Sequence, residues 1–564
     1  MNKITKFIPL IFSTFLISGC GGSDNYSTPT YEPEQEKPLE IKSITALSKI
    51  ADTNGNYKLI TDLDFSTQTS WTPIKGFKGT LDCDNHTISN FNYEYIAENN
   101  VGLFGTLEGT VKNLNLSGNL VGTGGCKNVG LLAGTNKGKV TSVKVSGSVS
   151  AELSTNVGGA FGYTYENIGG IENSATINGL DAVGGVAGHV ELSHNKSLSN
   201  GQGLMSKNTA KISGQSHIGG LFGEVKSEEY SFANSYAEVD VLNLENSGEV
   251  VGTKNCVGGI VGHVSSGKFG NKVSIANAKN TGTVTGDSFI SGLVGYGDDS
   301  FYRVKVSENK GDITGTGNSV GGFVGGSAGG FIENGTNEGN ITGGSYVGGL
   351  AGETNSLTDC KNKGTVKCTS HTLNGTQLLA CLGGVVGYTK SINYCTNEGT
   401  IIASTQGDRI GGVAGSLIMP SGNAVVQDNK NTVDVTAQGN DVGGIFGYVN
   451  IDDTTSKKTI ELKKNVNSGK VKSNSEHVGG IAGQIYSQKN QYSTYATGQV
   501  TFNTNTNNAD VTGFRYVGGL VGYATYVNDD ENIWKTNTQS GEVSATSEEN
   551  PYSGTYYGII NKFL

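Results

Sequence analysis

The chain has 564 residues, and its composition is uneven: 87 are glycine, 7 are proline, 3 are methionine and 2 are tryptophan. Acidic residues outnumber basic ones by 50 to 40, which gives a net charge of −10. No Lys/Arg cluster stands out, so the positive surface that nucleic acid requires is missing, and nucleic acid is not an expected partner. Glycine has no period of three, which excludes collagen.

The first twenty residues, MNKITKFIPLIFSTFLISGC, have the layout of a secretory signal. Lys3 and Lys6 precede an apolar run from Phe7 to Ile17, which is too short to span a bilayer permanently. The ending LISGC resembles the lipobox of bacterial lipoproteins, which implies cleavage before Cys20 and lipidation of its thiol. The alternative is an ordinary signal with a chance cysteine.

We therefore predict a lipoprotein signal peptide over residues 1–19. Residues 20–40 hold three of the prolines and several acids, which is typical of a flexible tether, here lipid-anchored. No later segment reads as transmembrane, so the lipid is the expected membrane contact. These features indicate a lipoprotein at the outer membrane or cell surface of a bacterium.

A glycine-rich hexad, such as VGGLVG at 517–522, recurs in fourteen strict or looser copies. We number the repeats one to fourteen by the glycine that closes each copy. The spacing between these glycines runs from 26 to 39 residues, which is the range of solenoid units. The closing glycines are Gly105, Gly134, Gly162, Gly188, Gly223, Gly262, Gly295, Gly325, Gly352, Gly387, Gly415, Gly447, Gly483 and Gly522.

A second signature, Asn-x-Gly-x-Val/Ile, falls inside the repeats, for example from Asn280 to Val284. We interpret its Asn and Gly as a corner that needs positive φ, and its β-branched residue as the start of a strand. Short strands repeated at this spacing can bury their apolar side only against the next copy. The sequence therefore predicts an all-β fold, a parallel β-helix or β-solenoid of about fourteen coils over 99–545. A propeller is the competing repeat fold, but its period is longer and steadier.

The hexads and the segment before them resemble the GLUG-motif repeat family of bacterial surface and secreted proteins. The resemblance covers about residues 44–543 and implies a surface repeat architecture. It says little about activity, because the family includes IgA-protease-like enzymes whose catalytic work sits in a separate metallopeptidase domain. This chain has no HExxH motif. The lead-in pieces are YKL from Tyr57, DLD from Asp62, WTPI from Trp71, FKGT from Phe77, and Asp82 to Ile88, where Cys83, Asp84 and Asn85 replace the usual Gly-Asn-Gly.

The ends of the array are expected to be covered, because open strand edges invite end-to-end pairing. We predict an N-terminal cap over 41–98, with a short amphipathic helix between Ile41 and Ala51. A C-terminal cap is predicted over 546–564.

Aromatic residues supply the candidate binding patch. Tyr directly follows five hexads, but never in adjacent repeats, so we expect no continuous aromatic strip. The loops of the last repeats are richer in aromatic rings, which can stack on glycans or protein partners; otherwise these rings cap the end of the solenoid. The predicted ligand-binding residues are Tyr486, Tyr492, Tyr495, Tyr523, Tyr526 and Trp534.

Other chemistry is less favoured. Cys360 and Cys395 should stack in successive coils, where a disulfide or a shared metal is possible in principle, but a buried ladder of small residues fits better. The acidic pair at Asp298 follows a hexad and is interpreted as solvated loop charge. Ser327 lies in a GxSxG match without the helix that a nucleophile elbow needs. We assign no catalytic residue, metal ligand or cofactor.

The predicted function is that of a non-enzymatic surface lipoprotein, whose solenoid serves adhesion or binding of a glycan or protein. The first alternative is a polysaccharide lyase or hydrolase on a pectate-lyase-like β-helix, and the second is a structural spacer. The enzyme would need a cluster of acids and bases on one face of three or four adjacent coils. The sequence alone shows no such cluster.

Overall fold

The computed structural model describes residues 37–547, 553–554 and 557–561, apart from 69, 166–167, 194–203, 228–237, 267–271, 299–301, 328, 370–371, 374–375, 378–380, 404–406, 420–423, 452–457, 488–497 and 526–535. The predicted signal peptide, Cys20 and most of the predicted tether lie outside the described residues. Pro38–Leu564 forms one compact unit. No helix in the described part of the chain is long and apolar enough to cross a membrane.

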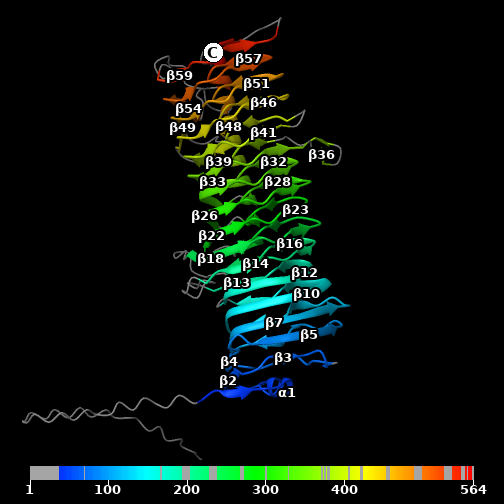
Figure 1. Cartoon of the computed structure of the whole chain (residues 1–564). Coiled ribbons are helices and arrows are strands. Elements are labelled where there is room, and N and C mark those ends of the chain that lie inside the picture. Colours follow the sequence, from blue (N-terminus) through cyan, green and yellow to red (C-terminus); the bar gives the residue numbers. More distant parts are fainter. Residues whose placement is uncertain are drawn as a thin grey trace, which may run out of the picture. The chain divides into compact units, whose positions relative to one another are not determined.

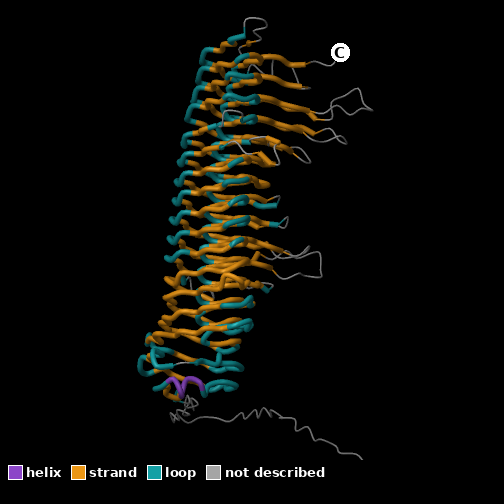
Figure 2. The backbone as a smooth tube through the Cα atoms, turned by 90° about the vertical axis from the view of Figure 1, so that its right-hand side faces the viewer, coloured by secondary structure: helices purple, strands orange, loops and turns teal. Residues whose placement is uncertain are grey.

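The unit is a stack of coils whose strands pair in parallel with the equivalent strands of the coils before and after (Figure 1). The register follows the hexads, because Val183 pairs with Ile218, and Ile218 pairs with Val257. Turns of successive coils line up along the stack when it is seen from the side (Figure 2). The predicted parallel β-solenoid is therefore confirmed.

Each hexad opens on one column of strands and closes on a second. The opening column holds β8 (Lys127–Gly130), the ends of β10 (Lys139–Gly158) and β12 (Ile168–Gly184), β16 (Ser216–Gly219), β20 (Val257–Gly258), β24 (Ile290–Ser291), β28 (Asn318–Gly321), β32 (Ser345–Gly348), β38 (Leu382–Gly383), β42 (Ile410–Gly411), β47 (Val442–Gly443), β52 (Glu476–Gly479), β57 (Arg515–Gly518) and β61 (Ser553–Gly554). The closing column holds β6 (Phe104–Leu107), β9 (Ala133–Asn136), β11 (Phe161–Tyr165), β13 (Ala187–Leu192), β17 (Phe222–Ser227), β21 (Val261–Ser266), β25 (Val294–Gly297), β29 (Val324–Ser327), β33 (Ala351–Thr358), β39 (Val386–Asn393), β43 (Ala414–Met419), β48 (Phe446–Ile451), β53 (Ala482–Ser487), β58 (Val521–Thr525) and β62 (Tyr557–Asn561).

Two further columns lie on either side of the Asn-x-Gly corner. The strands that lead into the corner are parts of β7 (Thr110–Gly122), β10 and β12, then β14 (Ser206–Asn208), β18 (Glu238–Asn246), β22 (Lys272–Asn280), β26 (Tyr302–Asn309), β30 (Phe331–Asn337), β34 (Lys361–Asn362), β40 (Thr396–Asn397), β44 (Ala424–Gln427), β45 (Lys430–Asn431), β49 (Lys458–Lys463), β50 (Val466–Asn467), β54 (Gly498–Asn503), β55 (Thr506–Asn507) and β59 (Thr538–Gln539). Those that leave it are β15 (Ile212–Gly214), β19 (Val250–Gly252), β23 (Val284–Gly286), β27 (Ile313–Gly315), β31 (Ile341–Gly343), β35 (Val366–Cys368), β41 (Ile401–Ile402), β46 (Val435–Ala437), β51 (Val471–Ser473), β56 (Val511–Gly513) and β60 (Val543–Ala545). A small antiparallel hairpin, β36 (Thr372–Leu373) and β37 (Thr376–Gln377), stands apart from these columns.

The hexad builds the core. Its fourth and fifth residues are both fully buried, as at Leu520 and Val521. Its glycines leave room for neighbouring coils: a Cβ on Gly480 would lie 2.3 Å from the Asn507 side chain, and one on Gly522 would lie 2.4 Å from the Val478 backbone nitrogen. The hexad is thus a packing element whose glycines mark close approaches.

A row of buried side-chain amides runs through the stack. Each Asn donates through Nδ2 to the amide oxygen of the next coil and to the carbonyl two residues later in its own coil, as Asn337 does to Asn362 and Gly339. The row joins Asn173, Asn208, Asn246, Asn280, Asn309, Asn337, Asn362, Asn397, Asn431, Asn467, Asn507 and Gln539 through bonds of 2.7 to 3.1 Å.

The explanation of the Asn-x-Gly signature by positive φ is wrong. Among the described glycines, only Gly76, Gly147 and Gly170 have positive φ. The glycine of the signature is needed because a Cβ on Gly282 would lie 2.0 Å from the Gly248 carbonyl oxygen of the previous coil. Left-handed φ occurs instead at the residue just before a hexad, for example His217 at 52° and Tyr516 at 56°.

The predicted N-terminal cap contains a helix, but it also forms coils of its own. α1 (Ile44–Ser48) begins after Ser43, whose side chain accepts a bond from the Ala46 N–H, and it buries Leu47. The remaining lead-in strands pair in parallel up to β7, so the stack has no break at residue 98. These strands are β1 (Leu39–Ile41), β2 (Asn56–Leu59), β3 (Leu63–Asp64), β4 (Thr80–Asp82) and β5 (Thr87–Tyr95).

The turn inside the lead-in forms without the family's glycines. Asp84 and Asn85 both have positive φ, at 48° and 66°, and the His86 N–H donates to the Cys83 carbonyl at 2.7 Å. Asp and Asn tolerate this conformation better than other residues with a side chain. The departure from the family pattern therefore leaves the tight turn intact.

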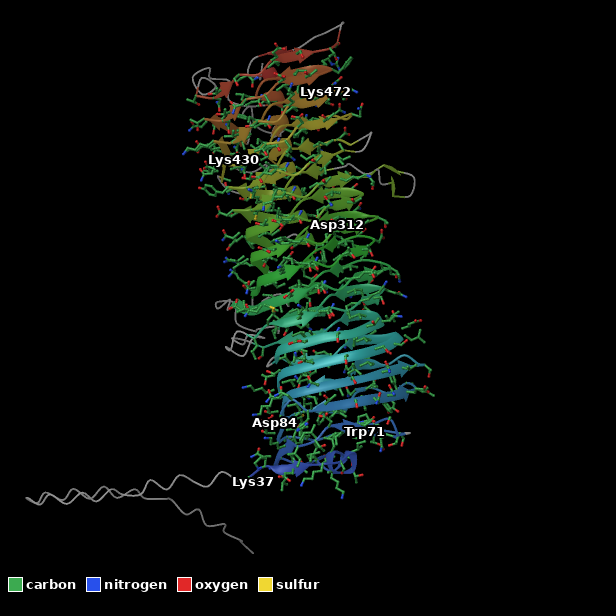
Figure 3. The ribbon with its side chains drawn as sticks, in the orientation of Figure 1. Lys37, Trp71, Asp84, Asp312, Lys430 and Lys472 are labelled. Carbon is green, nitrogen blue, oxygen red and sulfur yellow. The ribbon has the colours of Figure 1, made fainter. Side chains whose placement is uncertain are left out.

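The stack also continues into the predicted C-terminal cap. Ser553 and Gly554 pair with Val517 and Gly518, and Tyr557 pairs with Val521. The stretch SGTYYG at 553–558 is thus a degenerate fifteenth hexad. Charged side chains lie on the outside of the stack, as Asp312, Lys430 and Lys472 do in Figure 3.

Candidate ligand-binding surface

The predicted C-terminal patch is described only in part. Tyr492, Tyr495, Tyr526 and Trp534 lie outside the described residues. Tyr523 pairs with Gln484 of the previous coil, whereas Tyr486 pairs with Asn450. Tyr486 and Tyr523 therefore belong to different positions of the coil, and the structure does not bring them into one row.

Tyr523 instead lies in a cluster with two planar side chains that the prediction omitted. Its ring centroid is 4.8 Å from that of His477 and 5.6 Å from that of Tyr516, and the two tyrosine rings meet edge to face. His477 and Tyr516 each occupy the left-handed position before a hexad. A left-handed residue interrupts the alternation of the strand, so both remain partly exposed while the next residue is buried.

Charged and amide groups surround this cluster. The Arg515 guanidinium lies 4.8 Å from the Tyr516 ring centroid and pairs with Glu476. His477 donates from Nδ1 to Asp441 at 2.8 Å, and the Gln484 amide lies beside the same carboxylate, to which only the amide nitrogen can donate. The rings are thus held by hydrogen bonds and ion pairs from neighbouring coils.

Planar side chains recur at the same two positions along the stack. We call the residues just before and just after the hexads the planar stripe. Rings before the hexads add to those after them, but repeat eight has only Ser319 and Gly326 at these positions. Repeat eleven has Arg409 and Ser416 there and no aromatic ring. The rings therefore recur along the stack without forming a continuous strip. The planar members of the stripe are Tyr163, His189, His217, His263, Phe289, Tyr296, Tyr346, Tyr388, Arg409, Tyr448, His477, Tyr516 and Tyr523.

Over coils three to seven, the planar stripe contains a cluster of histidine and acidic side chains. The sequence alone indicates no cluster of acids and bases on adjacent coils, and the structure corrects that inference. Register aligns Tyr163, His189, Glu224, His263 and Tyr296 in consecutive coils. His189 Nδ1 donates to Glu224 at 3.1 Å, and the Ser265 hydroxyl donates to the other oxygen of that carboxylate at 2.8 Å.

Further acids complete this histidine–acid cluster. His263 Nδ1 lies 3.7 Å from Glu224, and its Nε2 donates to Asp298 at 3.2 Å. His217 stacks on His263 at 4.9 Å and donates from Nδ1 to Asp181 at 2.9 Å. Asp298 is therefore a partner of a histidine and not simply solvated loop charge.

The pairing sets the charge of the cluster. The hydrogen bond with Asp181 raises the pKa of His217 to about 9. Burial opposes the charged form of Glu224, but hydrogen bonds from His189 and His263 outweigh it and hold the pKa of this carboxyl well below its usual range. Burial likewise opposes protonation of His263, yet Glu224 and Asp298 raise its pKa.

His189 differs from the other two imidazoles. Its side chain is 11% exposed, and its buried Nε2 has no hydrogen-bond partner, while Nδ1 is bonded to Glu224. An imidazole oriented by a carboxylate at one nitrogen and free at the other can accept a proton. Alignment of the hexads indicates this cluster in the sequence, because the residues that follow the hexads of repeats three to seven are Tyr, His, Glu, His and Tyr.

The cysteine column is a buried ladder. Cys360 and Cys395 stack in successive coils as free, buried thiols, and each donates to a nearby carbonyl oxygen, that of Thr358 or Asn393. Among the described residues, no three His, Cys, Asp or Glu side chains are arranged to hold a metal ion. Ser327 is buried at the end of β29, and its hydroxyl accepts a bond from the Gly329 N–H.

Comparison with known proteins gives limited relationships. No family model matches the chain. Halomucin from Haloquadratum walsbyi is 36% identical over 164 residues, which is 25% of this chain and 2% of that protein. A crystal structure described as a putative immunoglobulin A1 protease from Bacteroides ovatus aligns over 78% of this chain and 85% of its own, with 14% identity and a TM-score of 0.19.

Proposed function

We propose that this protein is a lipid-anchored surface solenoid of the GLUG type that binds an extended glycan along its planar stripe. The observation that carries the proposal is the recurrence of partly exposed rings at equivalent positions of many coils. Aromatic faces offer apolar area with a polar tip, and flat sugar faces stack on such rings. The lipobox-like ending at Cys20 supports anchoring of the mature chain.

The cluster at Tyr516 and Tyr523 is the part of the stripe best suited to contact a ligand. Its two rings meet edge to face, and Arg515, Glu476 and Gln484 place donors and acceptors beside them. A glycan needs both kinds of contact, because its hydroxyls require hydrogen-bond partners when they leave water.

A glycan and protein array probed with residues 38–564 tests the proposal. Tyr516→Ala with Tyr523→Ala should weaken glycan binding at least about tenfold, which is the loss expected from one well-used binding residue, about 1.4 kcal/mol. Tyr394→Ala is the matched control, because Tyr394 is 45% exposed, has a left-handed φ like Tyr516 and lies outside the stripe.

The array also separates the rival functions. If the chain binds a protein and no glycan, the ligand is a protein and the proposed glycan ligand is wrong. Glycan binding that survives both tyrosine changes contradicts the stripe. A wild-type chain that binds nothing on the array supports a structural spacer.

The histidine–acid cluster favours a second candidate, a polysaccharide-cleaving enzyme. His189, oriented by Glu224 and free at Nε2, would accept the proton. Release of reducing ends or unsaturated products from a polysaccharide panel measures this activity. His189→Gln should abolish turnover, whereas His86→Gln should not, because His86 pairs with Asp62 outside the cluster. No turnover by the wild-type chain on any member of the panel rejects this candidate.

A further inference from the structure

A groove crosses coils three to six at the corner that precedes each hexad. The register shows why it lies there. Ala151 is level with Gly179, and Val157 with Val183, so five residues, 152–156, fill the corner of coil three where coil four has only three, 180–182. Coil five also has three, 215–217, and coil six has four, 253–256. Two tight corners thus lie between two wider ones, which hollows the surface.

The floor of the groove is bare backbone. Gly179 and Gly214 stand at its centre, and a Cβ on Gly214 would lie 2.6 Å from Ile218 Cδ1. The hollow has a volume of about 360 Å³, which is at the lower end of small-ligand sites, about 300–1,000 Å³. A cavity of this size holds a short ligand and not a folded domain.

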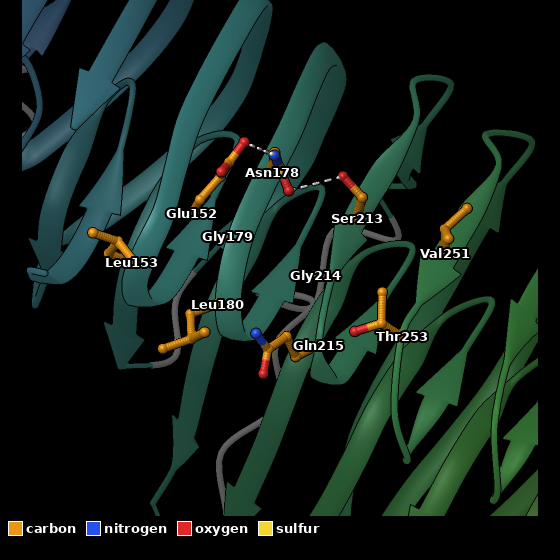
Figure 4. A pocket seen from close by; sticks show the side chains of 10 residues that line it. All are labelled: Glu152, Leu153, Asn178, Gly179, Leu180, Ser213, Gly214, Gln215, Val251 and Thr253. Atoms are coloured by element: carbon orange, nitrogen blue, oxygen red, sulfur yellow. Dashed lines mark hydrogen bonds between the residues drawn. The ribbon is translucent and has the colours of Figure 1, made fainter. Parts of the chain in front are cut away.

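One wall is a chain of polar side chains, each from a different coil. The Asn178 amide donates to Glu152 at 2.9 Å, and the Ser213 hydroxyl donates to the Asn178 amide oxygen at 3.1 Å (Figure 4). These bonds fix the Glu152 carboxylate at the upper rim. They also align one hydrogen-bonding group per coil along the stack.

The other wall mixes apolar and polar groups. Leu153, which is 60% exposed, and Leu180 lie across the glycines from Glu152 and Asn178, followed by Gln215 and Thr253 (Figure 4). An exposed leucine beside polar groups offers an apolar face as well as hydrogen bonds. The groove therefore presents a carboxylate, amides, hydroxyls and apolar patches within one small volume.

Backbone N–H groups at the corners of coils five and six are already paired. The N–H groups of Gln215, Thr253 and Lys254 donate to carbonyls of the preceding coil. A peptide that binds by adding a strand needs a free sheet edge, and this site has none. Recognition through side chains fits this arrangement, which suits a ligand with many hydroxyls.

We propose that this groove is a binding site for a short, uncharged saccharide that lies along the stack. Glu152, Asn178, Gln215 and Thr253 bind its hydroxyls, and Leu153 and Leu180 contact its apolar face. The single charged lining group is a carboxylate, which disfavours acidic sugars. The site uses none of the residues of the planar stripe, so it goes beyond the glycan binding proposed above and can fail or hold independently.

Titration calorimetry with residues 38–564 tests the groove, using neutral gluco- and manno-oligosaccharides and oligogalacturonate as an acidic probe. Wild-type protein should bind a neutral member and bind oligogalacturonate at least about tenfold more weakly. Asn178→Ala and Gln215→Ala should each lower the affinity for the neutral sugar about tenfold or more. Asn340→Ala is the control, because Asn340 is an exposed asparagine on a distant coil.

The outcomes separate the two sites. If the neutral sugar still binds to the Tyr516→Ala, Tyr523→Ala double variant and is lost in Asn178→Ala and Gln215→Ala, the groove is the site. If the tyrosine changes abolish binding and the groove changes do not, the groove proposal fails while the stripe stands. Equal binding of acidic and neutral sugars, or no binding by wild-type protein, overturns the groove proposal. Unchanged thermal melting of each variant confirms that it is folded.

Discussion

The buried amide row makes a quantitative prediction at Asn337. Asn337 is fully buried; it donates to Gly339 and to Asn362, each at 2.8 Å, and accepts a bond from Asn309 at 2.8 Å. Asn337→Ala removes all three bonds and leaves the Gly339 carbonyl without this partner. At about 1 kcal/mol for each bond, and more for a buried group left unpaired, the cost is about 3–5 kcal/mol.

The same coil supplies the control. Asn340 is exposed, and its amide donates to Asp312 at 3.0 Å at the surface. Asn340→Ala should therefore cost less than about 1 kcal/mol. The two substitutions change the same residue type three positions apart, so they differ mainly in burial.

Hydrogen exchange measures the effect where it acts. In a stack of coils, stability is the sum of coil and nearest-neighbour terms, so the opening free energy of β30 and β34 amides should fall by about 3–5 kcal/mol in Asn337→Ala. Amides of the lead-in strands should change little. Equal effects of the two substitutions, or a fall below about 1 kcal/mol for Asn337→Ala, would refute the view that the amide row stabilises the stack.

Three further outcomes are expected. His217 has an ordinary pKa of 6.5, and its pairing with Asp181 raises the folded-state pKa to about 9. The pairing therefore stabilises the fold fully below pH 6.5, and this stabilisation is lost as the pH rises through about 9. The melting-temperature difference between wild type and His217→Gln should shrink over that range, and a constant difference contradicts the pairing. Gly349→Ala places a Cβ 2.3 Å from the Asn362 side chain and should lower the free energy of unfolding by more than about 2 kcal/mol, whereas Gly169→Ala, whose nearest contact is 3.7 Å, should change it by less than about 1 kcal/mol in urea unfolding. Burial raises the pKa of the Cys395 thiol, so iodoacetamide should label it only after denaturation, and labelling of the native chain at pH 8 would show that the column opens.

The hexads predict the architecture well because their spacing is also the register. The first residues of successive hexads pair directly, as Val442 does with Val478 and Val478 with Val517. A repeat that must stack on its own copy leaves little choice of fold. The recurrence of the Asn-x-Gly signature also predicts a corner in each coil, but the role of its glycine cannot be deduced from one repeat. That glycine leaves room for a carbonyl oxygen of the previous coil, and this contact is not apparent in the sequence of a single repeat.

The sites were harder to predict, because they depend on neighbours across coils. Tyr523 was identified, but its contacts His477 and Tyr516 lie in the column before the hexads. The histidine–acid cluster is spread over more than one hundred residues, from Asp181 to Asp298, and emerges only when the hexads are aligned. The groove depends on where extra corner residues are inserted, and repeat length alone does not locate them.

The amide row gives the stack a dipole along its axis. Every member from Asn173 to Asn507 points its N–H toward the C-terminal coils and its oxygen toward the N-terminal coils. Backbone N–H and C=O groups alternate along parallel strands, so their dipoles largely cancel, whereas the side-chain dipoles add as peptide dipoles do in a helix. Hydrogen bonds in such a chain polarise one another. The row therefore ends in a partial positive charge at Gln539 and a partial negative charge at Asn173, which makes the two ends of the solenoid electrostatically different.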